Sequence, residues 1–117
     1  MHELALAEEV ALIVDAHSES LVRVTSITLA IGELAGVEVE ALLFALESTL
    51  LGGKAAQAEI LVETVPGRAR CGKCGTEQAL HTRFDSCEAC GAFGLRILQG
   101  DAMQVRAISG DTAPALH

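Results

Sequence analysis

The amino-acid sequence predicts an α+β protein in which two helices accompany a small mixed three-stranded sheet, with a cysteine-rich module inserted before the last strand. Two segments carry apolar residues at helical spacing, and three others alternate apolar and polar residues as strands do. Two close pairs of cysteines lie between the second and third of these strands. A chain of 117 residues with 50% hydrophobic content is long enough for one domain with a modest core.

The two predicted helices cover about residues 4–19 and 38–51. Each has apolar side chains along one stripe and acidic side chains off it, as expected for a helix that packs on one side. Gly52 and Gly53 end the second helix. Because His17 falls on the first stripe, we expect it to be a packed histidine and not a metal ligand. The stripes are Leu6, Ala7, Val10, Ile13, Val14 and His17 in the first helix, and Val39, Leu42, Leu43, Leu46 and Leu50 in the second.

The three predicted strands cover residues 21–31, 58–65 and 103–107. The first is rich in β-branched residues and changes phase at Thr25 and Ser26, which is typical of a bulge. A helix joins the first strand to the second, and such a connection favours a right-handed parallel crossover. The residues from Gly110 onward follow no pattern and are predicted to be loose.

The cysteine segment reads Cys71-Gly-Lys-Cys74 and, twelve residues later, Cys87-Glu-Ala-Cys90. Two such pairs aim four sulfurs at one ion, and this tetrahedral set is the one that Zn²⁺ accepts in closed structural sites. A glycine follows each pair, where the chain must bend around the metal in a left-handed conformation. The pattern therefore predicts a zinc-ribbon-like module with all four cysteines as zinc ligands. Free thiols, a disulfide and a four-sulfur iron site are the alternatives.

The position of the cysteines divides the chain into a zinc-binding module and the remaining α/β domain. Residues 1–66 and 99–110 form an α/β domain, residues 67–98 form the zinc-binding module, and residues 111–117 form a flexible tail. The module has few apolar residues, so we expect it to fold only with its ion.

The charge is −8 for the whole chain, with 16 acids against 8 bases. This balance disfavours binding to nucleic-acid phosphates, and three phenylalanines are the only aromatic residues available for base stacking. No secretion signal is visible and no apolar run approaches about 18 residues, so we expect a cytoplasmic protein that does not enter the membrane. Cysteines in such a chain indicate metal binding more than disulfides.

The amino terminus, Met1-His2-Glu3, offers a second metal site. The terminal amine, the deprotonated amide nitrogen of His2 and its imidazole form fused chelate rings around one ion. Nitrogen-rich planar geometry suits Ni²⁺ or Cu²⁺ and suits Zn²⁺ poorly. From spacing alone, a solvated histidine without a ligand role stays an open alternative.

Three motifs together resemble one known family, the HypA/HybF nickel-insertion proteins. They are Met1-His2-Glu3, the stretch Ile31-Gly32-Glu33-Leu34 after a strand, and Pro66-Gly67 before the paired cysteines. The resemblance covers about residues 1–109 in the same order. It implies a metallochaperone that delivers Ni²⁺ for maturation of [NiFe]-hydrogenase, and of urease in some members. A GTPase and the hydrogenase large subunit are the implied partners.

The resemblance also implies roles for particular residues. His2 would be the side-chain nickel ligand, with Met1 and Glu3 as further donors, and the four cysteines would bind zinc. It leaves open the role of Glu38 and whether the protein is a monomer or a homodimer. One departure is Glu88, where many relatives have proline; we expect a different local turn and the same ligand set.

Two other classes of function compete with this interpretation. A zinc-ribbon adaptor could bind proteins or nucleic acid, although the acidic charge and the scarcity of aromatic residues oppose the latter. An enzyme is not expected, because the chain has no Ser/His/Asp grouping and no glycine-rich phosphate loop. His81, between the cysteine pairs, is expected to be exposed, and His117 has no assigned role.

Overall fold

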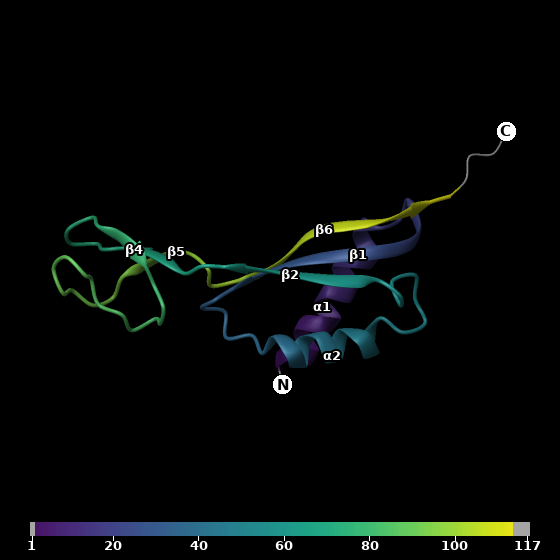
Figure 1. The fold of residues 1–117 in the computed structure, drawn as a ribbon, viewed down its shortest axis with the longest axis horizontal. Coiled ribbons are helices and arrows are strands. Elements are labelled where there is room, and N and C mark those ends of the chain that lie inside the picture. The colour runs from purple at the N-terminus through teal and green to yellow at the C-terminus, as the bar shows by residue number, and fades with distance from the viewer. Residues whose placement is uncertain (1, 114–117) are drawn as a thin grey trace. The chain divides into compact units, whose positions relative to one another are not determined.

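The computed structural model describes residues 2–113, which form two helices and six strands (Figure 1). No helix within these residues is long and apolar enough to cross a membrane. In chain order the elements are α1 (His2–His17), β1 (Leu21–Gly32), α2 (Val39–Thr49), β2 (Glu59–Val65), β3 (Arg68–Arg70), β4 (Glu77–Ala79), β5 (Arg96–Gln99) and β6 (Met103–Thr112).

The strands form two three-stranded sheets with the orders β2-β1-β6 and β4-β3-β5. In the first sheet the Arg23 guanidinium donates to Asp111 at 2.8 Å, and the Thr25 hydroxyl donates to the carbonyl of Ser109 at 3.2 Å. Residue numbers thus fall along β6 as they rise along β1, so these strands are antiparallel. The predicted α+β class, with two helices and a small mixed three-stranded sheet, is confirmed.

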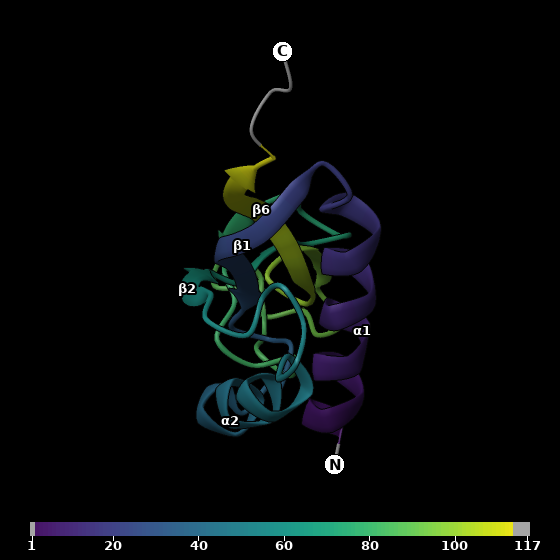
Figure 2. The ribbon, with the colours of Figure 1, turned by 90° about the vertical axis from the view of Figure 1, so that its right-hand side faces the viewer.

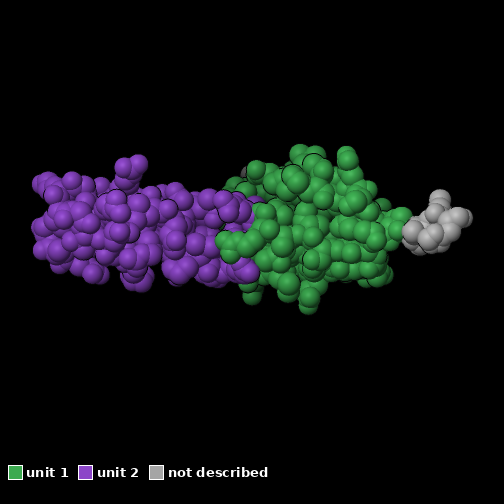
Figure 3. Space-filling model, turned by 90° about the horizontal axis from the view of Figure 1, so that it is seen from above, with its two compact units in different colours: residues 1–29, 37–62, 105–117 green, residues 30–36, 63–104 purple. Residues whose placement is uncertain are grey.

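The chain packs as two compact units, coloured separately in Figure 3. Among the described residues, unit 1 consists of 2–29, 37–62 and 105–113, and unit 2 consists of 30–36 and 63–104. Unit 2 therefore takes in more of the chain than the segment 67–98. The boundaries of the zinc-binding module, after residue 66 and after residue 98, stay a prediction.

The core of unit 1 lies between the helices and β1. Helices α1 and α2 pack against each other on one side of the strands (Figures 1 and 2). The buried residues of these helices and of β1 supply the apolar core of unit 1, and burial of such side chains stabilises the fold. The largest fully buried apolar side chains here are Val10, Val14, Val24, Ile27, Leu29, Leu42 and Leu46.

Two expectations about unit 1 need correction. His17 is exposed instead of packed, because it sits at the last turn of α1, where its Nδ1 lies 2.9 Å from the carbonyl oxygen of Ile13. Strand β6 runs to Thr112, two residues into the segment 111–117 that is predicted to be a flexible tail, and Asp111 of this strand pairs with Arg23 on β1. The rest of the predicted tail, from residue 114, and with it His117, lies outside the described residues.

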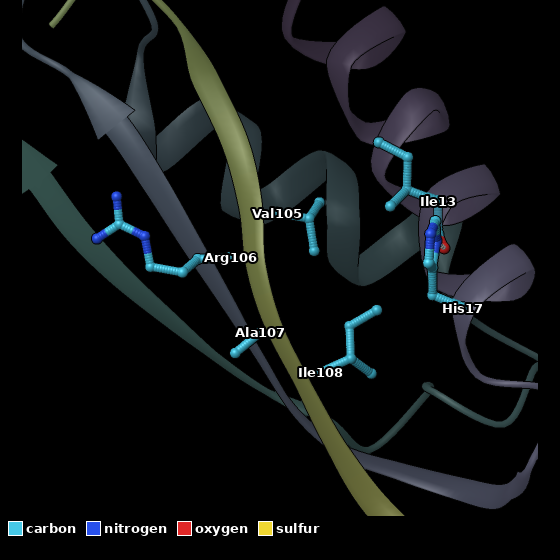
Figure 4. A pocket seen from close by; sticks show the side chains of 6 residues that line it. All are labelled: Ile13, His17, Val105, Arg106, Ala107 and Ile108. Carbon is cyan, nitrogen blue, oxygen red and sulfur yellow. Dashed lines mark hydrogen bonds between the residues drawn. The ribbon is translucent and has the colours of Figure 1, made fainter. Parts of the chain in front are cut away.

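The exposed His17 helps to line a shallow pocket between α1 and β6 (Figure 4). In that view the side chains of Val105 and Ile108 lie on the side of β6 that faces α1. The pocket holds about 270 Å³ and is open, so it offers no enclosed site for a small molecule. Its lining residues are Ile13, His17, Val105, Arg106, Ala107 and Ile108.

In unit 2 three chain segments cross at glycines. A Cβ on Gly32 would stand 2.1 Å from the carbonyl oxygen of Gly100, and one on Gly67 would stand 2.3 Å from that of Leu80. Only glycine permits this approach. The Glu33 carboxylate also accepts the amide N–H of Gly67 at 3.0 Å. The residues after β1 and after β2 that looked like separate motifs in the sequence therefore form one junction.

Candidate metal centres

The four cysteines that the sequence singled out lie together in unit 2. Their Sγ atoms are all within 4.8 Å of one another, and Cys71 to Cys90 and Cys74 to Cys87 measure 3.6 and 3.5 Å. A disulfide would require about 2.05 Å. Four sulfurs at about 2.3 Å from a tetrahedral zinc ion stand roughly 3.8 Å apart. The cluster therefore fits a structural zinc ion and contains no disulfide.

The two cysteine pairs sit on turns with the same hydrogen-bond pattern. The N–H of Gly75 donates to the carbonyl of Cys71 at 2.9 Å, and the N–H of Gly91 donates to that of Cys87 at 2.8 Å. Gly75 and Gly91 have φ angles of 77° and 74°. The left-handed glycines predicted after each pair are thereby confirmed, and each turn aims two sulfurs at the same point.

The thiols differ in exposure and acidity. Cys71 and Cys87 are buried, whereas Cys74 and Cys90 are exposed. The hydroxyl and N–H of Thr76 lower the pKa of Cys74 to about 6. The N–H of Ala92 lowers the pKa of Cys90, but the neighbouring sulfurs and desolvation outweigh it and raise the pKa to about 11. A zinc ion must displace the remaining thiol protons, so loading releases protons.

A residue that the sequence did not single out holds the second cysteine turn. The Gln78 side chain is buried, at 5% exposure. Its Nε2 donates to the carbonyl of Ser86 at 3.1 Å, and its Oε1 accepts the N–H of Glu88 at 2.8 Å. A proline at position 88, which the family resemblance leads one to expect, would have no N–H to donate. In this chain Gln78 uses the Glu88 N–H, and Cys87 and Cys90 lie in the four-cysteine cluster.

Replacing Gln78 by methionine is expected to weaken zinc binding by about tenfold to a hundredfold. The change keeps the side chain's size but leaves the Ser86 carbonyl and the Glu88 N–H without their partner, at about 0.5–1.5 kcal/mol for each lost hydrogen bond. Competition with a chromophoric chelator measures the zinc dissociation constant. Gln104→Met, an exposed glutamine of the same unit, is the matched control. An unchanged zinc affinity in Gln78→Met would contradict this role.

The amino-terminal residues lie on the first turn of α1, in unit 1. The His2 Nε2 stands 3.0 Å from the Glu3 Oε2, and the same oxygen accepts the N–H of Glu38 at 3.2 Å. Glu38 is the N-cap of α2 and makes no side-chain cap of its own. The Glu38 N–H is the main cause that lowers the pKa of Glu3. Glu3 thus links His2 to the start of α2; Met1 lies outside the described residues.

Other candidate residues stand apart from these clusters. Within residues 2–113, the four cysteines are the only close group of three or more potential metal-ligand side chains among His, Cys, Asp and Glu. His81 is exposed, as predicted, on a turn that the Asp85 carboxylate closes by accepting the N–H groups of His81 and Thr82. The contact between Glu3 and Glu38 joins residues 35 positions apart, so no local sequence pattern could reveal it.

Comparisons with known proteins agree with this picture over nearly the whole chain. The family described as "Hydrogenase/urease nickel incorporation, metallochaperone, hypA" matches residues 1–110. The hydrogenase maturation factor HypA of Geobacter sulfurreducens is 39% identical over 106 residues, covering 91% of this chain and 96% of the relative. That of Chlorobaculum tepidum is 38% identical over 111 residues, covering 93% of this chain and 98% of the relative.

A solved structure supports the fold independently. The solution structure of the Ni metallochaperone HypA from Helicobacter pylori superposes with a TM-score of 0.75. It covers 97% of this chain and 100% of that chain, at 16% sequence identity. Together with the family match and the curated relatives, this establishes that the chain belongs to the HypA family of metallochaperones for nickel incorporation into hydrogenase and urease.

Proposed function

We propose that this chain carries Ni²⁺ on its amino terminus for the maturation of [NiFe]-hydrogenase, while a structural zinc ion on the four cysteines holds unit 2 together. The nickel site is supported most directly by one distance: the Glu3 carboxylate lies 3.0 Å from the Nε2 of His2. A histidine that binds metal through one ring nitrogen usually donates the N–H of the other to a carboxylate, a backbone carbonyl or a water molecule. Glu3 holds the imidazole in that tautomer and leaves Nδ1 for the ion.

The helix start supports the same assignment. A chelate that includes the amide nitrogen of His2 closes through Nδ1, because Nε2 lies on the far side of the ring. The first N–H groups of a helix have no partner within it, so His2 and Glu3 can give up amide protons to nickel without breaking a helical hydrogen bond. With the Glu3 carboxylate engaged by Glu38, we assign the fourth planar position to the Glu3 backbone nitrogen.

Glu3→Gln is expected to lower nickel affinity by about tenfold to a hundredfold, the usual effect of losing a group that orients a metal-binding histidine. The amide side chain keeps the size of the glutamate but loses the charge that favours a proton on Nε2. Isothermal titration with Ni²⁺ measures the change. Glu9→Gln, exposed on the same helix, is the control and should bind as the parent does. Equal affinity in the two variants would show that Glu3 does not orient His2.

The proposed partners are a GTPase of nickel insertion and the hydrogenase large subunit, with urease as a further recipient. In this assignment the chain is a carrier and catalyses no reaction. Unit 1, which holds the nickel site, has three bases against ten acids. A surface of that sign attracts the cation and basic partner surfaces, and ionic strength screens the attraction.

A complementation experiment tests the function. A host whose own HypA-family protein is deleted receives this chain, and hydrogenase activity is followed at limiting and at excess nickel. The parent chain is expected to restore activity at limiting nickel, whereas His2→Ala should need excess nickel. A zinc-loaded parent chain that accumulates normally but fails to restore activity at limiting nickel would overturn the proposal.

A further inference from the structure

The second sheet, β4-β3-β5, has one buried and one exposed face. Ala69 and Gln78 lie on the buried face, where Leu34, Leu80 and Ile97 complete a small core. Because side chains alternate along a strand, Arg68 and Arg70 of β3 lie on the opposite face, and both are exposed. Across the ladder, Arg70 is the register partner of the exposed Arg96 on β5. We call Arg68, Arg70 and Arg96 the basic face.

On the basic face, Arg70 lies opposite another arginine, Arg96, and Glu77 is, among the described residues, the one acid that pairs with this group. Directly opposed side chains have Cβ atoms about 5 Å apart, and like charges there are destabilising. The Arg70 Nη2 meets Glu77 at 3.0 Å, but both side chains are about half exposed, and such a pair contributes little in water. Within residues 2–113, the side chains of Arg68 and Arg96 make no hydrogen bond or ion pair. The face is suited to an anionic partner.

The distance between the arginines of the basic face indicates which backbone conformation such a partner would have. Arg68 and Arg70 are alternate residues of one strand, so their side chains stand about 7 Å apart along it. Alternate residues of another extended chain repeat at the same distance. We propose that the basic face docks an extended acidic segment of a partner protein, with one carboxylate between Arg70 and Arg96 and the next on Arg68. Guanidinium groups bind carboxylates through paired hydrogen bonds.

Two other occupants fit less well. Nucleic acid would need stacking surfaces beside the arginines, and none of the three phenylalanines lies on β3, β4 or β5; the exposed Phe84 and Phe93 belong to the loops of unit 2. The chain as a whole carries a charge of −8, which disfavours binding to a phosphate backbone. A second copy of the chain would have to present acids at alternate positions of an extended segment. Glu8, Glu9 and Asp15 lie on helix α1, and Glu40 and Glu47 lie on helix α2. The two acids of strand β2, Glu59 and Glu63, are four positions apart, twice the spacing of alternate residues. The docking proposal does not depend on nickel binding.

The test uses the zinc-loaded full chain and two short peptides of equal charge and composition, one with glutamate at alternate positions and one with its glutamates contiguous. Fluorescence anisotropy measures binding at low and at physiological salt. The alternating peptide should bind more tightly, and salt should weaken it. The double variant Arg70→Gln with Arg96→Gln should lose about tenfold in affinity, since each exposed pair contributes modestly. The control Arg23→Gln, an exposed arginine of unit 1, should bind as the parent does.

Several results would overturn the proposal. Equal binding of the two peptides would show that the face has no preference for an extended acidic segment. Unchanged binding in a double variant that keeps its zinc would place the site elsewhere. Tighter binding of a single-stranded oligonucleotide, lost in the double variant, would assign the face to nucleic acid. Self-association that the double variant abolishes, measured by sedimentation, would assign it to a second copy.

Discussion

Nickel binding is expected to disappear, with affinity falling by more than about a hundredfold, when one residue is added before Met1 or when His2 is replaced by alanine. The added residue converts the terminal amine into an amide, which is a poor donor until it loses its proton. His2→Ala removes the imidazole from the same chelate. Both changes take away a direct ligand, so each should exceed the effect of Glu3→Gln. Isothermal titration of the variants side by side measures the difference.

The controls for the nickel prediction are the other described histidines. His17→Ala and His81→Ala should leave nickel affinity unchanged, since both side chains are exposed and neither belongs to a cluster of potential metal ligands. Zinc content should stay the same in all four variants. Nickel affinity of the parent should fall as pH is lowered, because amine, amide and imidazole must all lose protons to bind. Full affinity in both the extended chain and His2→Ala would mean that nickel binds elsewhere.

Cys87→Ser is expected to release zinc and to unfold the segment from about residue 67 to 98, leaving unit 1 folded. Cys87 is 3% exposed, so the variant leaves a buried hydroxyl where the ion needs a thiolate. Structural zinc contributes about 10–16 kcal/mol in zinc-finger peptides. The core around Leu34, Ala69 and Leu80 is too small to replace it. Metal analysis and amide hydrogen exchange report the loss of zinc and of protection.

The matched control for this variant is Ser86→Ala, the exposed neighbour of Cys87 in sequence. Its carbonyl, which Gln78 uses, is untouched by the substitution. It should keep one zinc ion per chain and the parent's exchange pattern. A Cys87→Ser chain that retains stoichiometric zinc and full protection of unit 2 would show that three thiolates suffice and that the ion is not what holds the segment together.

The sequence by itself predicted the features that depend on local spacing. The apolar stripes placed α1 and α2, and alternation placed β1, β2 and the first half of β6. The two cysteine pairs placed the cluster that the structure brings within 4.8 Å. A pair separated by two residues meets one ion whatever the rest of the chain does, because the turn geometry is set locally. For the same reason, the left-handed conformations of Gly75 and Gly91 followed from their positions alone.

The tertiary structure alone decided the features that join distant segments. Strands β3 and β4 have three residues each and β5 has four, too few for alternation to identify, and they exist because they pair with one another around the cysteines. The burial of Gln78 follows from that pairing, and the last residues of β6 continue beside β1, where Asp111 contacts Arg23. The link from Glu3 to Glu38 needs two helices to meet. Each of these contacts forms only if its hydrogen bonds outweigh the entropy lost when the long loop between the two residues is closed. A short stretch of sequence contains only one of the two partners and therefore cannot predict the contact.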